Sequence, residues 1–195
     1  MTLIKSISGI RGTIGGCPGE ALTPLDTVKF TSAYGTWLKK GSKGRMKVVT
    51  GRDARVSGSM VAAVVNNTLV SLGIDVVDLG LATTPTVEVA VMKLGASGGI
   101  ILTASHNPAQ WNALKLLNGR GEFLSAADGE EVLRIAAAEE FDYAQWNELG
   151  TIVADGSWCD NHIKAVKDLD LVDVEAIRKA GFTVAVDAVN SVGGI

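Results

Sequence analysis

The sequence predicts an α/β fold: a mixed, mostly parallel sheet with helices on both faces, followed by the start of a second similar α/β domain. Short, almost wholly apolar runs alternate with longer runs of helical periodicity along the chain, and this alternation is typical of strands covered by helices. Glycines follow most of these runs, where they end a helix or a strand. The composition, 47% hydrophobic and 20% charged, is that of a globular protein.

The first predicted helix starts at Thr23-Pro24, since threonine caps a helix well and proline suits its first turn. Gly41 is expected to close this helix. The next predicted elements are a strand over residues 46–50, a helix over 57–72, a strand over 74–79 and a helix over 85–94. Glycines are expected to end both strands, at Gly51 and at Gly80.

A fully apolar strand over residues 98–102 leads directly into a polar segment. Residues 114–117 are predicted to add a strand that pairs back. Residues 125–140 are predicted to form an amphipathic helix, with Ser125 as its N-cap. These elements make up a complete first domain.

A polar, glycine-containing stretch then marks a predicted domain boundary, which divides the chain into residues 1–152 and 153–195. The predicted elements that follow are helices over 160–167 and 174–180 and an apolar strand over 182–187. A domain that ends on its first strand has no sheet to join. The chain is therefore expected to be a truncated part of a longer polypeptide.

Charge and composition exclude several classes of function. With 18 basic and 21 acidic residues the net charge is −3, so no basic excess points to nucleic acid. No apolar run approaches the roughly 20 residues of a membrane span, and the N-terminus lacks the pattern of a signal peptide. Cys17 and Cys159 lie far apart and are predicted to be free thiols. A cytoplasmic location is predicted.

Gly95-Ala96-Ser97-Gly98-Gly99 matches the G-x-S-x-G pattern of serine hydrolases. A nucleophile elbow needs a strand before the serine and a helix after it. Here a predicted helix precedes Ser97 and a predicted strand follows it. A serine hydrolase that uses Ser97 is therefore a disfavoured alternative.

The segment Thr103-Ala104-Ser105-His106-Asn107-Pro108 lies at the carboxyl end of the predicted strand over 98–102. Open α/β sheets place their ligands at this end of their strands. The same residue types also build ordinary turns. Local chemistry alone therefore leaves both a ligand site and a plain turn open.

Four further motifs occur in order along the chain. They are Gly9-Ile10-Arg11-Gly12, Gly51-Arg52-Asp53-Ala54-Arg55 with Ser57-Gly58, Gly80 with Thr84-Pro85, and Asp187-Ala188-Val189-Asn190. With the serine segment, they resemble the signature motifs of the α-D-phosphohexomutase superfamily across essentially the whole chain. The resemblance implies an isomerase that interconverts hexose 6-phosphate and hexose 1-phosphate through a phosphoserine and a bound sugar bisphosphate. It leaves a phosphoglucosamine mutase and a phosphomannose or phosphoglucose mutase open.

The resemblance assigns the phosphoserine to Ser105 and catalytic roles also to Lys115, Arg11 and His106. It assigns phosphate binding to Arg11, Asn107 and Lys115. The chemistry fits, because phosphoryl transfer depends on positioned cations and arginine binds phosphate bidentately. A lysine beside a phosphate dianion stays protonated and suits a proton donor. The lysine segment departs from the family pattern, with Ala113 in place of the usual glycine, which permits a positive φ.

The resemblance also implies Mg²⁺, held mainly by aspartates of an Asp-Gly-Asp-Gly-Asp loop and by a phosphate oxygen on Ser105. That loop does not occur in this sequence. The expected partners are a phosphorylated hexose and the remaining domains of the same polypeptide, without which this part is expected to be inactive. A non-catalytic sugar-phosphate-binding or interaction domain is the alternative. Arg52 and Arg55 are predicted to be structural and ion-paired with Asp53.

Overall fold

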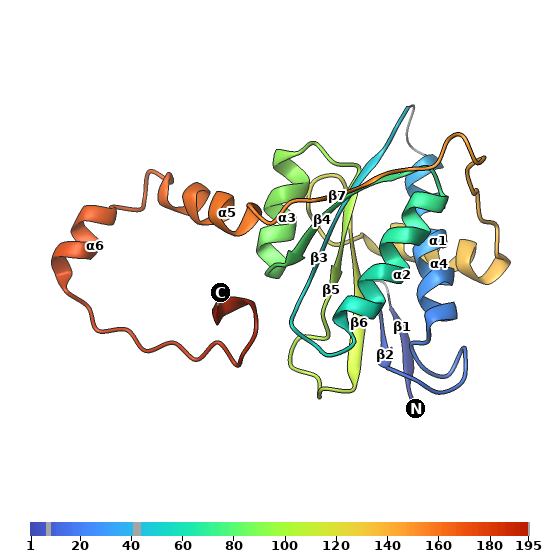
Figure 1. Ribbon diagram of the computed structural model, residues 1–195, viewed down its shortest axis with the longest axis horizontal. Helices are drawn as coiled ribbons and strands as arrows, with labels where there is room; N and C mark the ends of the chain where they lie inside the picture. The colour runs from blue at the N-terminus through green and yellow to red at the C-terminus, as the bar shows by residue number, and fades with distance from the viewer. Residues whose placement is uncertain (7–8, 41–43, 195) are drawn as a thin grey trace.

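The computed structural model describes residues 1–6, 9–40 and 44–194, which form a seven-stranded sheet and the helices that cover it (Figure 1). The strands are β1 (Leu3–Ser6), β2 (Gly9–Thr13), β3 (Lys47–Arg52), β4 (Asp75–Leu81), β5 (Gly98–Leu102), β6 (Trp111–Leu117) and β7 (Ile152–Ala154). The spatial order is β1-β2-β6-β5-β3-β4-β7. The chain thus forms the mixed α/β sheet that the sequence predicts.

The sheet has a parallel half and an antiparallel half. β3 pairs in parallel with both β4 and β5, and β7 pairs in parallel with β4. β6 pairs antiparallel with β5 and with β2, and β1 pairs antiparallel with β2. The strand predicted to pair back is therefore real, and it starts three residues before the predicted start.

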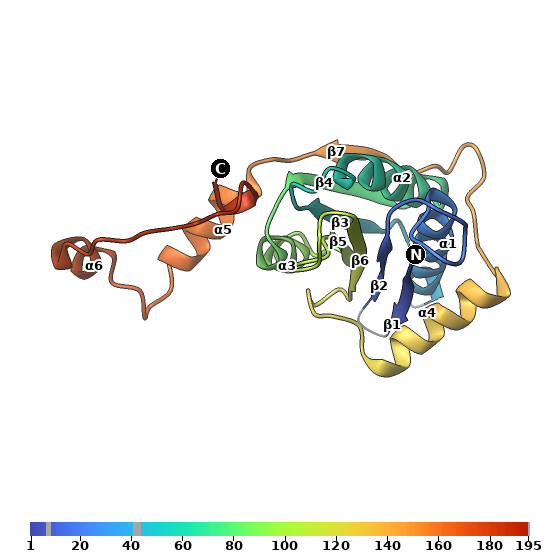
Figure 2. The same ribbon diagram turned by 90° about the horizontal axis from the view of Figure 1, so that it is seen from below.

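Helices cover both faces of the sheet, as predicted (Figure 2). On one face lie α1 (Pro24–Lys40), α2 (Gly58–Ser71) and α4 (Ala126–Ala138). On the other lies α3 (Thr84–Lys93), and α5 (Trp158–Lys167) packs against α3. Successive residues of β5 alternate between two hydrophobic clusters, with Ile100 and Leu102 in one and Ile101 in the other. A run apolar at every position is thus explained by burial on both faces.

The predicted helix starts are confirmed. α1 begins at Pro24, and the hydroxyl of Thr23 donates to the Asp26 carboxylate while accepting from the Asp26 amide. α4 begins after Ser125, whose hydroxyl accepts from the amide of Asp128. The predicted closing residue of α1, Gly41, lies outside the described residues.

The side of α1 that faces the sheet carries a buried phenol. The Tyr34 hydroxyl donates to the carbonyl oxygen of Leu117 at 2.7 Å, and its ring is completely buried. Burial raises the pKa of Tyr34 well above its ordinary value. A methyl group at Gly98 would come within 2.2 Å of the Tyr34 hydroxyl oxygen. The glycine that begins β5 therefore lets α1 pack directly against the sheet.

Two strands continue through the glycines that were expected to end them. A methyl group at Gly51 would lie 2.5 Å from a methyl carbon of Val87, so this glycine lets α3 approach β3. Gly80 has φ +65° inside β4, and the β3–β4 register shifts between Thr50 and Arg52. The prediction was wrong here because glycine serves close packing and a bulge rather than a stop.

β7 is anchored at the edge of the sheet by Asp75. The Asp75 carboxylate accepts two hydrogen bonds from the guanidinium of Arg45, at 2.6 and 2.7 Å, and two from the amide and hydroxyl of Thr151, at 2.8 and 2.7 Å. The predicted boundary between residues 152 and 153 falls within β7. It remains a prediction, although hydrogen bonds to β4 attach the whole of β7 to the first sheet.

Protonation of Asp75 is expected to release β7. The Arg45 guanidinium holds the pKa of Asp75 well below its usual range, with the Thr151 hydrogen bonds acting in the same direction. Because the folded pKa is depressed, the stabilisation is complete above about pH 4, the ordinary pKa of aspartate, and is lost as the pH falls through the lower folded value. Asp75→Asn should accelerate amide hydrogen exchange in residues 151–154 several-fold at neutral pH.

Exchange measured by mass spectrometry checks this prediction, with Asp168→Asn as the control. Asp168 is an exposed carboxylate that forms an ion pair with Lys164, four residues before it. Unchanged protection of residues 151–154 in Asp75→Asn would show that Asp75 does not anchor β7.

The last segment leaves the sheet. α6 (Val174–Ala180) matches the prediction and lies well away from the other helices (Figure 1). Residues 182–187 form no strand, so that prediction was wrong for this chain. A strand needs a partner to take up its backbone hydrogen bonds, and Phe182, Val184 and Val186 are mostly exposed here.

Candidate active site

Ser105 lies in the loop between β5 and β6, residues 103–110, which is called the serine loop below. Its φ is +55°, in the left-handed region that non-glycine residues rarely adopt. The side chain is exposed at the carboxyl end of β5. Such backbone strain persists only where surrounding contacts hold it, and it is concentrated at functional sites.

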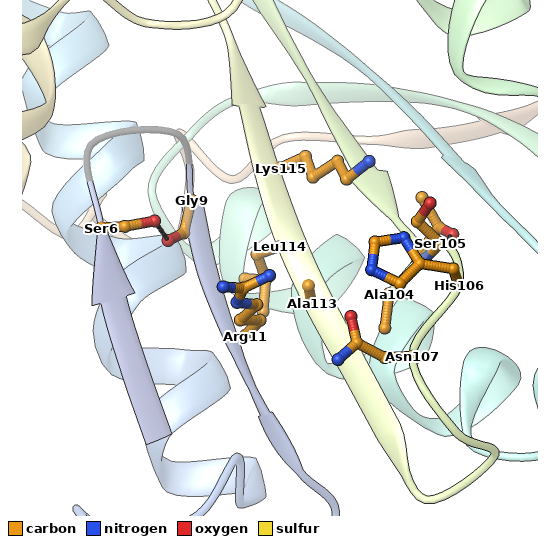
Figure 3. Close-up of a pocket in the computed structure, with 11 residues that line it drawn as sticks. Ser6, Gly9, Arg11, Ala104, Ser105, His106, Asn107, Ala113, Leu114 and Lys115 are labelled. Carbon is orange, nitrogen blue, oxygen red and sulfur yellow. Dashed lines mark hydrogen bonds between the residues drawn. The ribbon is translucent and has the colours of Figure 1, made fainter. Parts of the chain in front are cut away.

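A cavity of about 380 Å³ opens beside Ser105 (Figure 3). The structure brings all five predicted catalytic and phosphate-binding residues to its wall, although they come from three separate segments. The residues that line it are Ser6, Gly9, Arg11, Thr103, Ala104, Ser105, His106, Asn107, Ala113, Leu114 and Lys115. Ser6 and Thr103 were not predicted as site residues, and no spacing in the sequence points to Ser6.

The two cations of the cavity come from neighbouring strands. Arg11 on β2 is opposite Ala113 on β6, and Lys115 lies two residues further along β6. Two residues apart on a strand means the same face of the sheet, and Figure 3 shows the Lys115 side chain extending toward Ser105. Ala113 is not among the residues of positive φ. The alanine that replaces the family's glycine is therefore accommodated in ordinary strand conformation.

The cavity favours an anion. Among the described residues that line it there is no carboxylate, while Arg11, Lys115 and the polar side chains of the serine loop all face it. Burial raises the pKa of the Glu88 carboxyl on α3 above its ordinary value, and the charge of Lys115 opposes that rise. The Lys115 ammonium also lies 6.0 Å from the centre of the Phe123 ring. The arrangement suits a phosphate group in contact with Ser105.

Residues of the Gly51–Gly58 motif form a second group, which contacts the serine loop outside the cavity. Arg55 forms the predicted ion pair with Asp53, at 3.1 Å. Arg52 does not join that pair: its guanidinium instead donates to the backbone carbonyl of Asp53, at 3.2 Å. At the end of the loop, the buried side-chain amide of Asn112 donates to the hydroxyl of Ser57 at 2.9 Å. The Gly51–Gly58 motif thus lies against the serine motif, a proximity that the sequence could not give.

The residues of this chain do not fit a magnesium site by themselves. Mg²⁺ prefers several oxygen ligands, among them carboxylates. In the part of the chain that the structure describes, no three His, Cys, Asp or Glu side chains are grouped so that they could hold a metal ion. A single seryl oxygen is not sufficient, so no step through a metal is derived for this chain.

Ser97 lies between the end of α3 and the start of β5, in the context that the sequence predicts. It is therefore at the opposite end of β5 from Ser105. Of the two histidines, His106 is in the serine loop, and His162 accepts or donates a hydrogen bond with Thr86. Ser97 thus lacks the strand–turn–helix setting of a serine nucleophile.

No helix in the described residues is long and apolar enough to cross a membrane. Both cysteines are free, as predicted.

Comparison with known families places most of the chain. Residues 3–143 match the family model of phosphoglucomutase/phosphomannomutase, alpha/beta/alpha domain I. A phosphoglucomutase/phosphomannomutase of Thermococcus kodakarensis is 39% identical over 186 residues, which cover 94% of this chain and 40% of that protein. A phosphoglucosamine/phosphogalactosamine mutase of Sulfurisphaera tokodaii is 34% identical over 188 residues, or 96% of this chain and 39% of that protein.

Solved structures show the same fold. A protein of Thermus thermophilus, described as a phosphomannomutase by inference, superposes with a TM-score of 0.75 at 26% identity, covering 94% of this chain and 38% of that one. A phosphoglucomutase/phosphomannomutase family protein of Burkholderia thailandensis superposes with a TM-score of 0.69 at 24% identity, covering 87% and 38%. The chain thus spans about 40% of the length of the curated relatives named above.

Proposed function

The chain belongs to the phosphoglucomutase/phosphomannomutase family, and from this premise we propose that it is the phosphoserine-bearing part of a phosphohexomutase. The proposed reaction interconverts hexose 6-phosphate and hexose 1-phosphate, with Ser105 as the phosphate carrier. The observation that carries the proposal is the position of Ser105, strained and exposed, at the mouth of a cavity with two cations and no acidic residue in its described lining.

In the proposed first transfer, the bond between phosphorus and Ser105 Oγ breaks, and a bond forms from phosphorus to a hydroxyl oxygen of the hexose phosphate. Lys115 donates a proton to Ser105 Oγ, and the proton released by the sugar hydroxyl passes to His106. A sugar bisphosphate results. In the second transfer, the other phosphate of the sugar moves to Ser105 by the same steps in reverse.

Arg11 and Asn107 have binding roles in this proposal. Arg11 binds the incoming phosphate bidentately, because its planar guanidinium matches two phosphate oxygens. Asn107, which lines the same cavity, donates to the phosphate from its side-chain amide. Phosphoryl transfer draws most of its catalysis from such positioning and charge neutralisation.

The proposal places part of the active site outside this chain. When bound, Mg²⁺ would neutralise phosphate charge, and we assign its ligands mainly to carboxylates elsewhere in the polypeptide, with one oxygen from the Ser105 phosphate. The two relatives named above act on differently substituted hexoses by their descriptions. The proposed substrate is therefore a hexose phosphate as a class, and a cytoplasmic location remains a prediction.

An assay of the complete polypeptide that contains this chain tests the proposal. With Mg²⁺ and a trace of hexose 1,6-bisphosphate, the complete polypeptide should convert the 1-phosphate of glucose, mannose or glucosamine to the 6-phosphate. The 195-residue chain alone should give no turnover. Turnover by the 195-residue chain would refute the division of the active site. Binding of hexose phosphates without any turnover by the complete polypeptide would favour the non-catalytic alternative.

A further inference from the structure

Arg55 uses every N–H group of its guanidinium. An arginine side chain has five such donors in a rigid plane, and Arg55 makes five hydrogen bonds with them. Four go to backbone carbonyl oxygens in or next to the serine loop, and the fifth goes to a carboxylate. The acceptors are Ser105 O at 2.7 Å, Asn107 O at 2.8 Å, Pro108 O at 2.8 Å, Trp111 O at 2.9 Å and Asp53 Oδ2 at 3.1 Å.

Asp53 is connected to the backbone N–H of Ser105 through Thr103. The Thr103 hydroxyl donates to Asp53 Oδ2 at 2.6 Å, and the same hydroxyl oxygen accepts the backbone N–H of Ser105 at 3.0 Å. The carbonyl of Ser105 is bound by Arg55 and its N–H is bound through Thr103. Both backbone polar groups of this residue are therefore fixed by the Asp53–Arg55 pair.

These hydrogen bonds can hold Ser105 in its strained backbone conformation. A non-glycine residue in the left-handed region costs about 1–3 kcal/mol and persists only where its surroundings hold it. The Asp53 and Arg55 side chains are only 18% and 11% exposed, so water screens their hydrogen bonds weakly. Without these bonds, the backbone is expected to relax to negative φ, and the serine side chain would then leave its position in the cavity.

We infer that the Asp53–Arg55 pair is a positioning device that holds Ser105 in its left-handed conformation, with Thr103 as the link to its N–H. The inference rests on the proposed function for its meaning in phosphoryl transfer. Its geometric part stands on the hydrogen bonds alone. Neither residue is itself part of the lining of this cavity. Both are bonded to lining residues, so their effect on the phosphate passes through Ser105.

Thr103 offers a matched pair of variants. Thr103→Ser keeps the hydroxyl that links Asp53 to the Ser105 amide, whereas Thr103→Val keeps the shape and loses the hydroxyl. Arg55→Lys tests the hydrogen bonds from Arg55 to the loop carbonyls. Lysine has three donors on a single nitrogen, so it cannot replace the five donors of the planar guanidinium. Arg134→Lys is the control, since Arg134 lies on the surface of α4 and pairs with Glu131 and with Glu140 beyond the end of the helix.

The first measurement is the backbone conformation of Ser105 in the chain, from its NMR chemical shifts and its amide-to-α-proton coupling. We expect left-handed values in the wild type, Thr103→Ser and Arg134→Lys, and their loss in Thr103→Val and Arg55→Lys. Left-handed values retained in both of the last two variants would overturn the inference. This measurement does not depend on any chemistry at Ser105.

The second measurement is the rate of hexose phosphate conversion by the complete polypeptide. A misplacement of about 1 Å at a reacting group can cost about 100-fold in rate, so we expect losses of this order in kcat for Arg55→Lys, with KM little changed and Thr103→Ser close to wild type. Equal kcat in Thr103→Val and Thr103→Ser would overturn the positioning role. If the wild type itself gives no turnover, the proposed function fails, and the conformation of Ser105 decides the inference by itself.

Discussion

Replacing Ser105 by alanine is expected to reduce phosphoryl transfer by the complete polypeptide to background. The change removes the one oxygen that carries the phosphate in the proposed reaction. The other hydroxyl residues in the described lining of the cavity, Ser6 and Thr103, do not have the positive φ of Ser105. Because Ser105 is exposed, and alanine carries the same Cβ as serine in the left-handed region, the free energy of unfolding should change by no more than about 1 kcal/mol. The measurements are conversion of hexose 1-phosphate and a urea denaturation curve.

Ser97→Ala is the matched control for this variant. Ser97 lies at the opposite end of β5 and is the serine of the hydrolase alternative. The Ser97→Ala variant should keep full activity, and a fluorophosphonate probe should not label Ser97 in the wild type. Wild-type turnover by Ser105→Ala would refute the carrier role, while loss of activity only in Ser97→Ala would favour the hydrolase.

The second large effect is expected for Lys115→Met, which keeps most of the side-chain length and removes the ammonium group. General acid catalysis of this kind contributes about 100-fold to 10,000-fold, and kcat should fall within that range. The fold should persist, because Lys115 is only half-buried and β6 is held by neighbours on both sides. Loss of its charge should also remove the influence that opposes the raised pKa of Glu88.

Lys167→Met provides the control, since Lys167 is exposed in the last turn of α5. It should leave kcat and KM unchanged. A wild-type kcat in Lys115→Met would exclude Lys115 as the proton donor and leave it at most a binding role. A rise in KM with an unchanged kcat in Lys115→Met would likewise leave Lys115 only a role in binding.

Local signals in the sequence predicted most of the fold. Caps such as Ser125 and the apolar run of β5 act through neighbours in the chain, so their consequences can be read from short segments. Residues 182–187 show the limit, because an apolar run becomes a strand only when another strand lies beside it. Gly51 shows a second limit, since its role depends on Val87 in a distant helix.

Some features of the candidate site could likewise be predicted from the sequence, and others could not. Motif resemblance predicted Ser105, Arg11 and Lys115 as site residues, and the structure brings them to one cavity. The hydrogen bonds from Arg55 to the serine loop span 50 to 53 positions of sequence, and no spacing predicts them. The positive φ of Ser105 was likewise not predictable, because serine has no local preference for it.

The central claim is that Ser105 carries the transferred phosphate. The most direct test is to incubate the complete polypeptide with hexose 1,6-bisphosphate and Mg²⁺ and to map phosphorylation by tandem mass spectrometry. The claim predicts one phosphoryl group, on Ser105, that is lost when excess hexose phosphate is added. A phosphate on another residue, or an unmodified Ser105 in a polypeptide that turns over hexose phosphate, would contradict it.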